Sequence, residues 1–210
     1  MIENVVLDFG HGGMLNGKYV TAPSKMHTYK DGEEAFEGVL NRQIGEEIRK
    51  CIHSHRGVYD ITTVAFDDPT DLPLSKRVAV ANALDPKSTI FVSVHCNASP
   101  SHNAGGFEIF SSKGVTESDQ LAKDVHEMAI LAVKRAGMRD RGIKEENFYV
   151  LRKTKCAAIL IECGFFDFKR DFVNLKDPEF QGDLGSMIYT GILNYINGKN
   201  KRQNQVPLRC

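Results

Sequence analysis

The sequence predicts a single α/β domain with a six-stranded, mostly parallel, twisted sheet and helices on both faces. Short β-branched runs alternate with helical patterns along the chain, which is the order expected of a mainly parallel sheet covered by helices. A length of 210 residues also suits one domain of this class. We assign residues 1–198 to the domain. Residues 199–210 are polar and lack apolar periodicity, so we expect a flexible tail there.

Apolar, β-branched runs bounded by turn residues are predicted as strands. The six predicted strands are Val5 to Phe9, Ile61 to Phe66, Thr89 to His95, Gly106 to Phe110, Phe148 to Leu151 and Ala158 to Glu162. Because helical segments separate most of these runs, parallel pairing is expected to dominate.

Four segments repeat apolar residues at intervals of three and four, which is the period of an amphipathic helix. They are marked by Ile44, Ile48 and Cys51, by Val78, Ala81 and Leu84, by Leu121, Val125, Met128, Ala132 and Ala136, and by Met187, Ile188, Ile192 and Ile196. The last helix is expected to begin at Asp177-Pro178, a capping residue followed by a first-turn proline. Gly198 is expected to end it.

The segment from Met14 to Phe36 shows neither period and is rich in Gly, Lys, Tyr, Thr and Ser. We expect a long loop, a kind of segment that is usually functional or disordered in compact domains. Since it joins His11 to Glu37, it should border the functional site. His27 and Tyr29 within it could touch a substrate, but a solvated loop is the favoured interpretation for both.

Composition excludes several partners. Lys and Arg together number 27, as do Asp and Glu, so no net charge attracts the chain to nucleic acid or to an anionic membrane. No apolar stretch is long enough to span a bilayer, so no membrane insertion is expected. Met1 leads directly into the first strand without a signal peptide, which predicts synthesis in the cytoplasm. The five cysteines lack a framework spacing and are expected to be thiols. We expect a monomer.

Two histidines and a glutamate end predicted strands, at the edge where open α/β sheets bind ligands. These residues are His11, His95 and Glu162. A catalytic zinc ion takes three protein ligands, for which two histidines and one glutamate are a known set. Glu37 could supply that glutamate, although spacing alone does not choose it over Asp31, Glu33 and Glu34. Glu162 lies in an apolar strand where burial should raise its pKa, which suits an acid/base group.

Each residue also has an ordinary structural interpretation. His11 could be a turn residue, His95 a hydrogen-bonded core histidine, and Glu37 an acid at a helix N-terminus. Glu162 is harder to explain this way, because a glutamate after Ala-Ile-Leu-Ile is costly to bury without a partner or a purpose. The four residues together therefore indicate a catalytic site more strongly than any one of them alone.

The chain resembles the zinc-dependent N-acetylmuramoyl-L-alanine amidases of the amidase-3 type, from Val5 to about Asn194. The matching segments are DFGHGG at Asp8, EGVLN at Glu37, LSKRVAVAN at Leu74, SVHCNA at Ser93, GGFEIF at Gly105, RGIK at Arg141, FYVLR at Phe148 and IECGFF at Ile161. This family cuts the amide between muramic acid and the peptide stem, so the resemblance implies peptidoglycan as the partner. It departs at Phe9, at Phe168 and across Met14 to Lys30.

The resemblance implies that His11, Glu37 and His95 bind one zinc ion and that Glu162 is the catalytic acid/base. It favours Glu37 over the neighbouring acids because the family glutamate precedes an asparagine by four, as Glu37 precedes Asn41. Asn97 is a candidate for substrate binding.

Several alternatives stay open. Arg77 and Arg141 could orient substrate or form structural ion pairs. The chain could instead be a zinc peptidase acting within the stem, or a non-catalytic module that binds peptidoglycan. A cysteine hydrolase using Cys96 or Cys163 is disfavoured, because neighbours of inward-facing strand residues point the other way. Without a signal peptide or a wall-binding domain, we expect a phage or prophage endolysin released by a separate holin-type pore.

Overall fold

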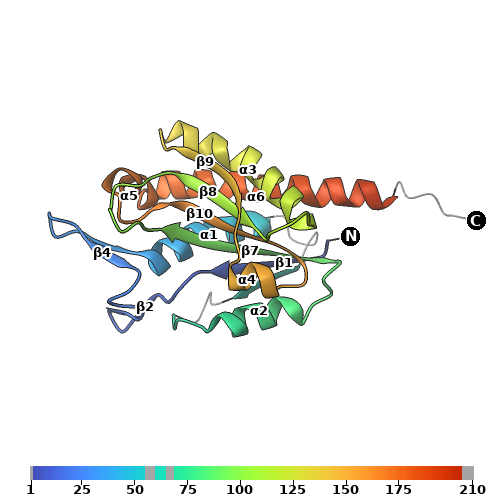
Figure 1. Ribbon diagram of the computed structural model, residues 1–210, viewed down its shortest axis with the longest axis horizontal. Helices are drawn as coiled ribbons and strands as arrows, with labels where there is room; N and C mark the ends of the chain where they lie inside the picture. The colour runs from blue at the N-terminus through green and yellow to red at the C-terminus, as the bar shows by residue number, and fades with distance from the viewer. Residues whose placement is uncertain (1, 55–59, 65–68, 205–210) are drawn as a thin grey trace, which may run out of the picture.

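A computed structural model describes residues 2–54, 60–64 and 69–204, and its centre is a six-stranded sheet (Figure 1). The strands are β1 (Asn4–Phe9), β6 (Asp60–Val64), β7 (Thr89–Asn97), β8 (Phe107–Ser111), β9 (Asp140–Glu145) and β10 (Ala157–Phe165). Their order is β6-β1-β7-β10-β8-β9. The first four are mutually parallel, whereas β8 pairs antiparallel to β10 and parallel to β9. The predicted fold class is confirmed.

Helices cover both faces of this sheet. On one face α1 (Glu37–Ser54), α3 (Glu117–Arg135) and α6 (Pro178–Asn204) pack together, and on the other lie α2 (Leu74–Asn82) and the short α4 (Tyr149–Lys153) (Figure 1). Alternation along β1 divides the core accordingly, with Leu7 buried under the first layer and Val6 under the second. Among the described helices, none is both long and apolar enough to cross a membrane.

One predicted strand is wrong, and one strand of the sheet was not predicted. Phe148 to Leu151 is not a strand: it leads into α4, and a four-residue apolar run has no periodicity that separates strand from helix. The sixth strand is instead β9, whose sequence DRGIKE is mostly charged because it forms an edge of the sheet. The run predicted from Ile61 is confirmed as far as Val64, and residues 65–66 lie outside the described ones.

The C-terminal helix begins where predicted and runs further than predicted. The Asp177 carboxylate accepts a hydrogen bond from the Glu179 N–H at 3.0 Å, as a capping residue does. Gly198 does not end the helix, which continues to Asn204. A glycine ends a helix when it takes a left-handed conformation after the last turn, and Gly198 lies within the helix instead. Residues 205–210 of the expected tail lie outside the described ones.

The segment predicted as a loop contains two small hairpins. β2 (Met14–Leu15) pairs with β3 (Lys18–Tyr19), and β4 (Met26–Thr28) pairs with β5 (Glu34–Phe36). Strands of two or three residues are too short to show an alternating pattern, so they could not be predicted from residue order.

The β4–β5 hairpin is anchored to α5 (Lys169–Leu175), a helix that sequence periodicity did not predict. The Tyr29 ring stacks on Phe172 with 5.1 Å between centroids, and its hydroxyl donates to the Phe166 carbonyl at 2.8 Å. Lys169 donates to the carboxylates of Asp31 and Glu33, each at 2.7 Å. The solvated interpretation of Tyr29 is therefore wrong.

Candidate metal centre

The turn after β1 places His11 beside the end of β7. Gly10 donates its N–H to the Val94 carbonyl at 3.0 Å, which continues the β1–β7 pairing by one residue. His11 then takes a left-handed backbone conformation with φ of 61°, which is uncommon for a residue with a side chain. A Cβ at Gly10 would lie 2.1 Å from Cε1 of His95. Glycine is required here because the His95 ring occupies that space.

Helix α1 brings Glu37 to the same place. Glu37 is the first residue of the helix and is buried, with its N–H donating to the Lys25 carbonyl at 2.9 Å. One turn later, Asn41 donates from Nδ2 to the Gly10 carbonyl at 3.0 Å, and Arg42 donates to the His11 carbonyl at 2.9 Å. The start of α1 is thus fixed against the turn that carries His11.

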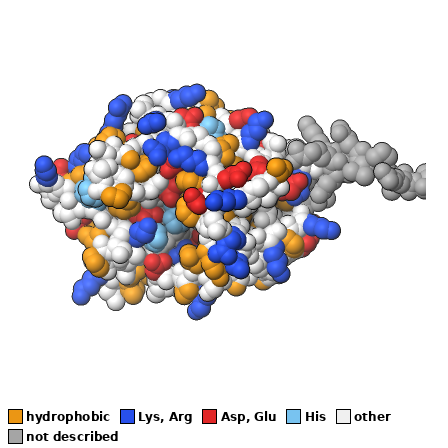
Figure 2. Space-filling model, viewed as in Figure 1, with side chains coloured by type: hydrophobic (Ala, Val, Ile, Leu, Met, Phe, Trp, Pro, Cys, Tyr) orange, Lys and Arg blue, Asp and Glu red, His pale blue; other side chains and the backbone are white. Residues whose placement is uncertain are grey.

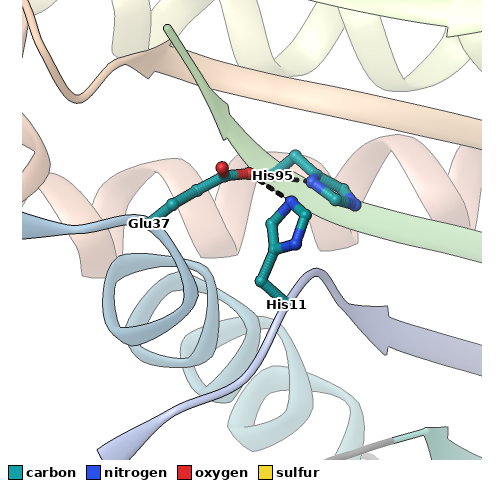
Figure 3. Close-up of side chains that lie close together, drawn as sticks. All are labelled: His11, Glu37 and His95. Carbon is teal, nitrogen blue, oxygen red and sulfur yellow. Dashed lines mark hydrogen bonds and ion pairs between the residues drawn. The ribbon is translucent and has the colours of Figure 1, made fainter. Parts of the chain in front are cut away.

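The side chains of His11, Glu37 and His95 converge on one point (Figure 3). Oε1 of Glu37 lies 3.3 Å from Nε2 of His11 and 3.0 Å from Nδ1 of His95. One ligand atom from each residue lies within 4.8 Å of the other two. Ligands about 2.0–2.2 Å from a tetrahedral zinc ion are roughly 3.3 Å apart, so the donor set and spacing fit such an ion.

The Glu37 carboxylate is held in its charged form. Burial acts to raise its pKa, but hydrogen bonds and charge from His11 and His95 outweigh burial and bring the pKa below its usual range. The Lys25 ammonium lies 3.5 Å from the other carboxylate oxygen, Oε2. A deprotonated carboxylate is the form that binds a metal.

Glu162 lies beside His95, because the two residues are partners in the β7–β10 register. Its Oε2 is buried and has no hydrogen-bond partner among the described residues. Burial raises the pKa of Glu162 well above its usual range, and the charges of Glu37 and Glu108 raise it further. Burial and these two negative charges therefore favour the protonated form of the carboxyl group.

These four residues line a cavity of about 260 Å³. Its apolar wall is formed by Leu74, Phe148, Tyr149, Val150 and Leu160. Three of these come from the short α4 and its N-terminal cap, so the element predicted as a strand forms one side of the site. Histidine side chains are visible near the centre of the face shown in Figure 2, between acidic and basic groups.

Arg77 borders the same cavity, but its guanidinium is fully engaged by the protein itself. Its side chain is 2% exposed, and each of its five N–H groups has an acceptor. The acceptors are Oδ1 of Asp8 at 2.6 Å, Oδ1 of Asp71 at 3.2 Å, and the carbonyls of Phe9 at 2.8 Å, His11 at 3.4 Å and Leu72 at 2.9 Å. Through the Phe9 and His11 carbonyls, Arg77 therefore stabilises the turn that carries His11.

Asn97 and Arg141 meet at Glu108. Asn97 lines the cavity and donates from Nδ2 to Oε1 of Glu108 at 2.8 Å, while Arg141 donates from Nε to Oε2 at 2.9 Å. Glu108 is the register partner of Glu162 on β8. Arg141 is thus an ion-pair donor in the structure.

Strand alternation sends both neighbouring thiols into the core, as predicted. Cys96 is 1% exposed and Cys163 is fully buried. Burial raises the pKa of each thiol, which suppresses the reactive thiolate. Neither thiol is suited to act as a nucleophile.

Sequence reasoning missed several residues that shape the site. Gly10 and Asn41 position two candidate ligands, and Lys25 reaches Glu37 from a loop that gave no signal. Asp71 lies 3.7 Å from Nδ1 of His11. Asn41 could have been found, because it stands one helical turn after Glu37 and faces the same side.

Fold and site together define an α/β protein with a His-Glu-His cluster of metal-ligand type beside a buried acid, at the carboxyl edge of a sheet. The chain belongs to the amidase-3 family, N-acetylmuramoyl-L-alanine amidase, whose model matches residues 5–194. It therefore shares the amidase class of activity, with peptidoglycan as substrate.

Individual relatives agree with this membership. The endolysin of Bacillus phage SPP1 is 30% identical over 212 aligned residues, covering 99% of this chain and 71% of the phage protein. An N-acetylmuramoyl-L-alanine amidase from Clostridium difficile 630 matches with a TM-score of 0.77 and 30% identity over 94% of this chain and 98% of that one. The catalytic domain of CwlV from Bacillus (Paenibacillus) polymyxa matches with a TM-score of 0.75 and 28% identity, covering 93% and 99%.

Proposed function

We propose that the protein is a zinc-dependent amidase that hydrolyses the bond between the lactyl group of muramic acid and the L-alanine of the peptide stem. The observation that carries this proposal is the convergence of His11, Glu37 and His95 within 4.8 Å of one another. The register pairing of His95 with Glu162 adds an acid/base group to the same point.

His11, Glu37 and His95 would hold the zinc ion, which supplies a Lewis acid for the scissile carbonyl and for the attacking water. Glu162 accepts a proton from that water and donates one to the departing L-alanine nitrogen. Its raised pKa suits the donating half of this cycle. The accepting half needs the carboxylate, and positive charge close by favours that form.

Other residues orient the substrate. Asn97 lines the cavity, and one of its amide N–H groups is occupied by Glu108. We assign the other N–H to a substrate carbonyl. The apolar wall, which includes Leu74 and Tyr149, excludes water from one side of the site. This exclusion strengthens electrostatic interactions within the site.

We further propose that the enzyme is lytic, acting on the bacterial wall as an endolysin of a phage or prophage. The likeness to the phage SPP1 endolysin extends over 99% of the chain and supports this role. Clearing of a suspension of Gram-positive walls, lost on chelation and regained with added zinc, is the expected result.

Mass spectrometry of purified peptidoglycan after digestion tests the reaction itself. Free stems that begin with L-alanine, together with glycan that keeps its lactyl groups, are expected only without a chelator. Shortened stems would instead identify a peptidase, and an intact sacculus that retains the protein would identify a binding module. Glu162→Gln serves as the control that should give no product.

A further inference from the structure

A second groove opens at the same edge of the sheet as the candidate metal centre. It has a volume of about 390 Å³ and is bordered by the side chains of Arg139, Arg141 and Arg170. Gly105, Phe168 and Asp171 also line it. Lys and Arg side chains gather over β9 on the face shown in Figure 2.

Topology places this groove next to the reaction centre. β8 runs antiparallel to β10, so the start of β8 lies at the end of β10 that follows Glu162. Phe107 is the register partner of Asp140, which sets Arg139 and Arg141 beside the start of β8. Arg141 also donates to Glu108, the register partner of Glu162. One ion pair and one strand spacing therefore separate the groove from the acid.

Positive charge exceeds negative charge in the groove, since Arg141 pairs with Glu108 while Arg139 and Arg170 face the carboxylate of Asp171. In the part of the chain that the structure describes, neither Arg139 nor Arg170 forms an ion pair with a carboxylate. Among the described residues of the lining, Asp171 is the one acid, and its Oδ2 already accepts the N–H groups of Gly106 at 2.7 Å and Phe165 at 3.0 Å. The chain as a whole has no net charge, so this local excess stands out.

Two glycines allow the segments around the groove to pack closely. A Cβ at Gly105 would lie 2.6 Å from the Phe168 ring, and one at Gly106 would lie 2.5 Å from the Arg139 carbonyl. Gly106 also has a φ of 118°, which side chains rarely adopt. The guanidinium of Arg141 is held over the Phe165 ring, 5.0 Å from its centroid. The arginines therefore border a preformed hollow.

We propose that this arginine groove binds a carboxylate of the peptide stem, and the proposal rests on the amidase function above. Guanidinium groups bind carboxylates through paired, charge-assisted hydrogen bonds. The peptide side of the scissile bond ends in a carboxylate. One ion pair and one strand spacing place the groove roughly 10 Å from Glu162. An extended peptide covers about 3.3–3.6 Å per residue, so about three stem residues would span this distance.

The test compares a synthetic muramyl peptide that carries free stem carboxylates with its fully amidated counterpart, both free of phosphate. The zinc-loaded wild type is expected to cleave the acidic form with a kcat/KM about tenfold higher, a typical scale for an accessible charged hydrogen bond. The double variant Arg139→Gln and Arg170→Gln should lose this preference through KM, with kcat unchanged. Arg135→Gln, a surface arginine paired with Asp183, removes the same kind of charge elsewhere and should keep the preference.

Binding separates this proposal from the proposed function. Calorimetry measures the affinity of the Glu162→Gln variant for each peptide. This variant should bind the acidic peptide at least about fivefold more tightly than the amidated one. The measurement does not require turnover. A wild type that cleaves neither peptide would overturn the amidase assignment and leave this binding test intact. Equal affinity for the two peptides would overturn the proposal that the groove binds a stem carboxylate. The same holds if the arginine substitutions have an effect only on walls that carry phosphate polymers.

Discussion

Gly10→Ala tests whether the turn after β1 sets the geometry of the metal centre. The new methyl group would lie 2.1 Å from Cε1 of His95, whereas ordinary contact begins at 3.4 Å. The ring must retreat by at least 1.3 Å, the difference between these two distances. Metal–ligand distances are held to about 0.2 Å, so this movement would take His95 out of the proposed ligand set. Zinc affinity should fall by about 100-fold or more.

Zinc affinity is measured by competition with a chromophoric chelator, and stability by urea unfolding of the metal-free protein. Overpacking should cost about 1–3 kcal/mol of unfolding free energy, which leaves the chain folded. Gly182→Ala is the matched control, since a Cβ there meets nothing within 4 Å. Replacing this glycine within a helix should stabilise the protein by about 0.5–1 kcal/mol and leave zinc affinity unchanged. Wild-type zinc affinity in Gly10→Ala would refute the reasoning.

Three further changes test other parts of the structure. Glu162→Gln should retain zinc and lose activity by about 10²–10⁴-fold, measured by release of stem peptides, and near-normal turnover would contradict the acid/base role. Arg77→Met leaves the Asp8 carboxylate buried and unpaired and should cost about 3–5 kcal/mol in urea unfolding. Arg135→Met, at an exposed ion pair, should cost under about 1 kcal/mol, and equal losses would show that burial is not the cause. Burial raises the pKa of Cys156 from 9.0 to about 11, so the folded state keeps a proton that the unfolded state releases. Stability should therefore fall by roughly 2 kcal/mol between pH 9 and 11, and Cys156→Ala should flatten this slope.

The strand-end residues could be predicted from sequence because each follows an apolar run. Open α/β sheets bind ligands at the carboxyl edge, so this pattern predicts that the three residues lie together. The structure places them in one cavity: His11, His95 and Glu162. Glu37 could not be chosen from spacing among four nearby acids. The structure separates them: Asp31 and Glu33 pair with Lys169, and Glu37 turns inward to the histidines.

Elements without strong periodicity could not be predicted. β9 is charged because its outer edge is unpaired, and the α4 run is too short to show a helical period. The roles of Arg77 and Arg141 depend on partners that are distant in sequence. Asp8 lies 69 positions from Arg77, and Glu108 lies 33 positions from Arg141. Such contacts are determined by tertiary packing, which residue type alone does not specify.

The position of β10 in the sheet also determines when, during synthesis, Glu162 can join the other three residues of the candidate site. The three candidate ligands all lie within the first 95 residues, whereas Glu162 arrives on β10, which inserts between β7 and β8. A chain released before this strand could assemble the ligand cluster but would lack the acid beside it. Pairing of distant strands is also slow compared with local folding. Under the proposed mechanism, hydrolytic activity therefore appears only once β10 has been made and has paired with β7 and β8.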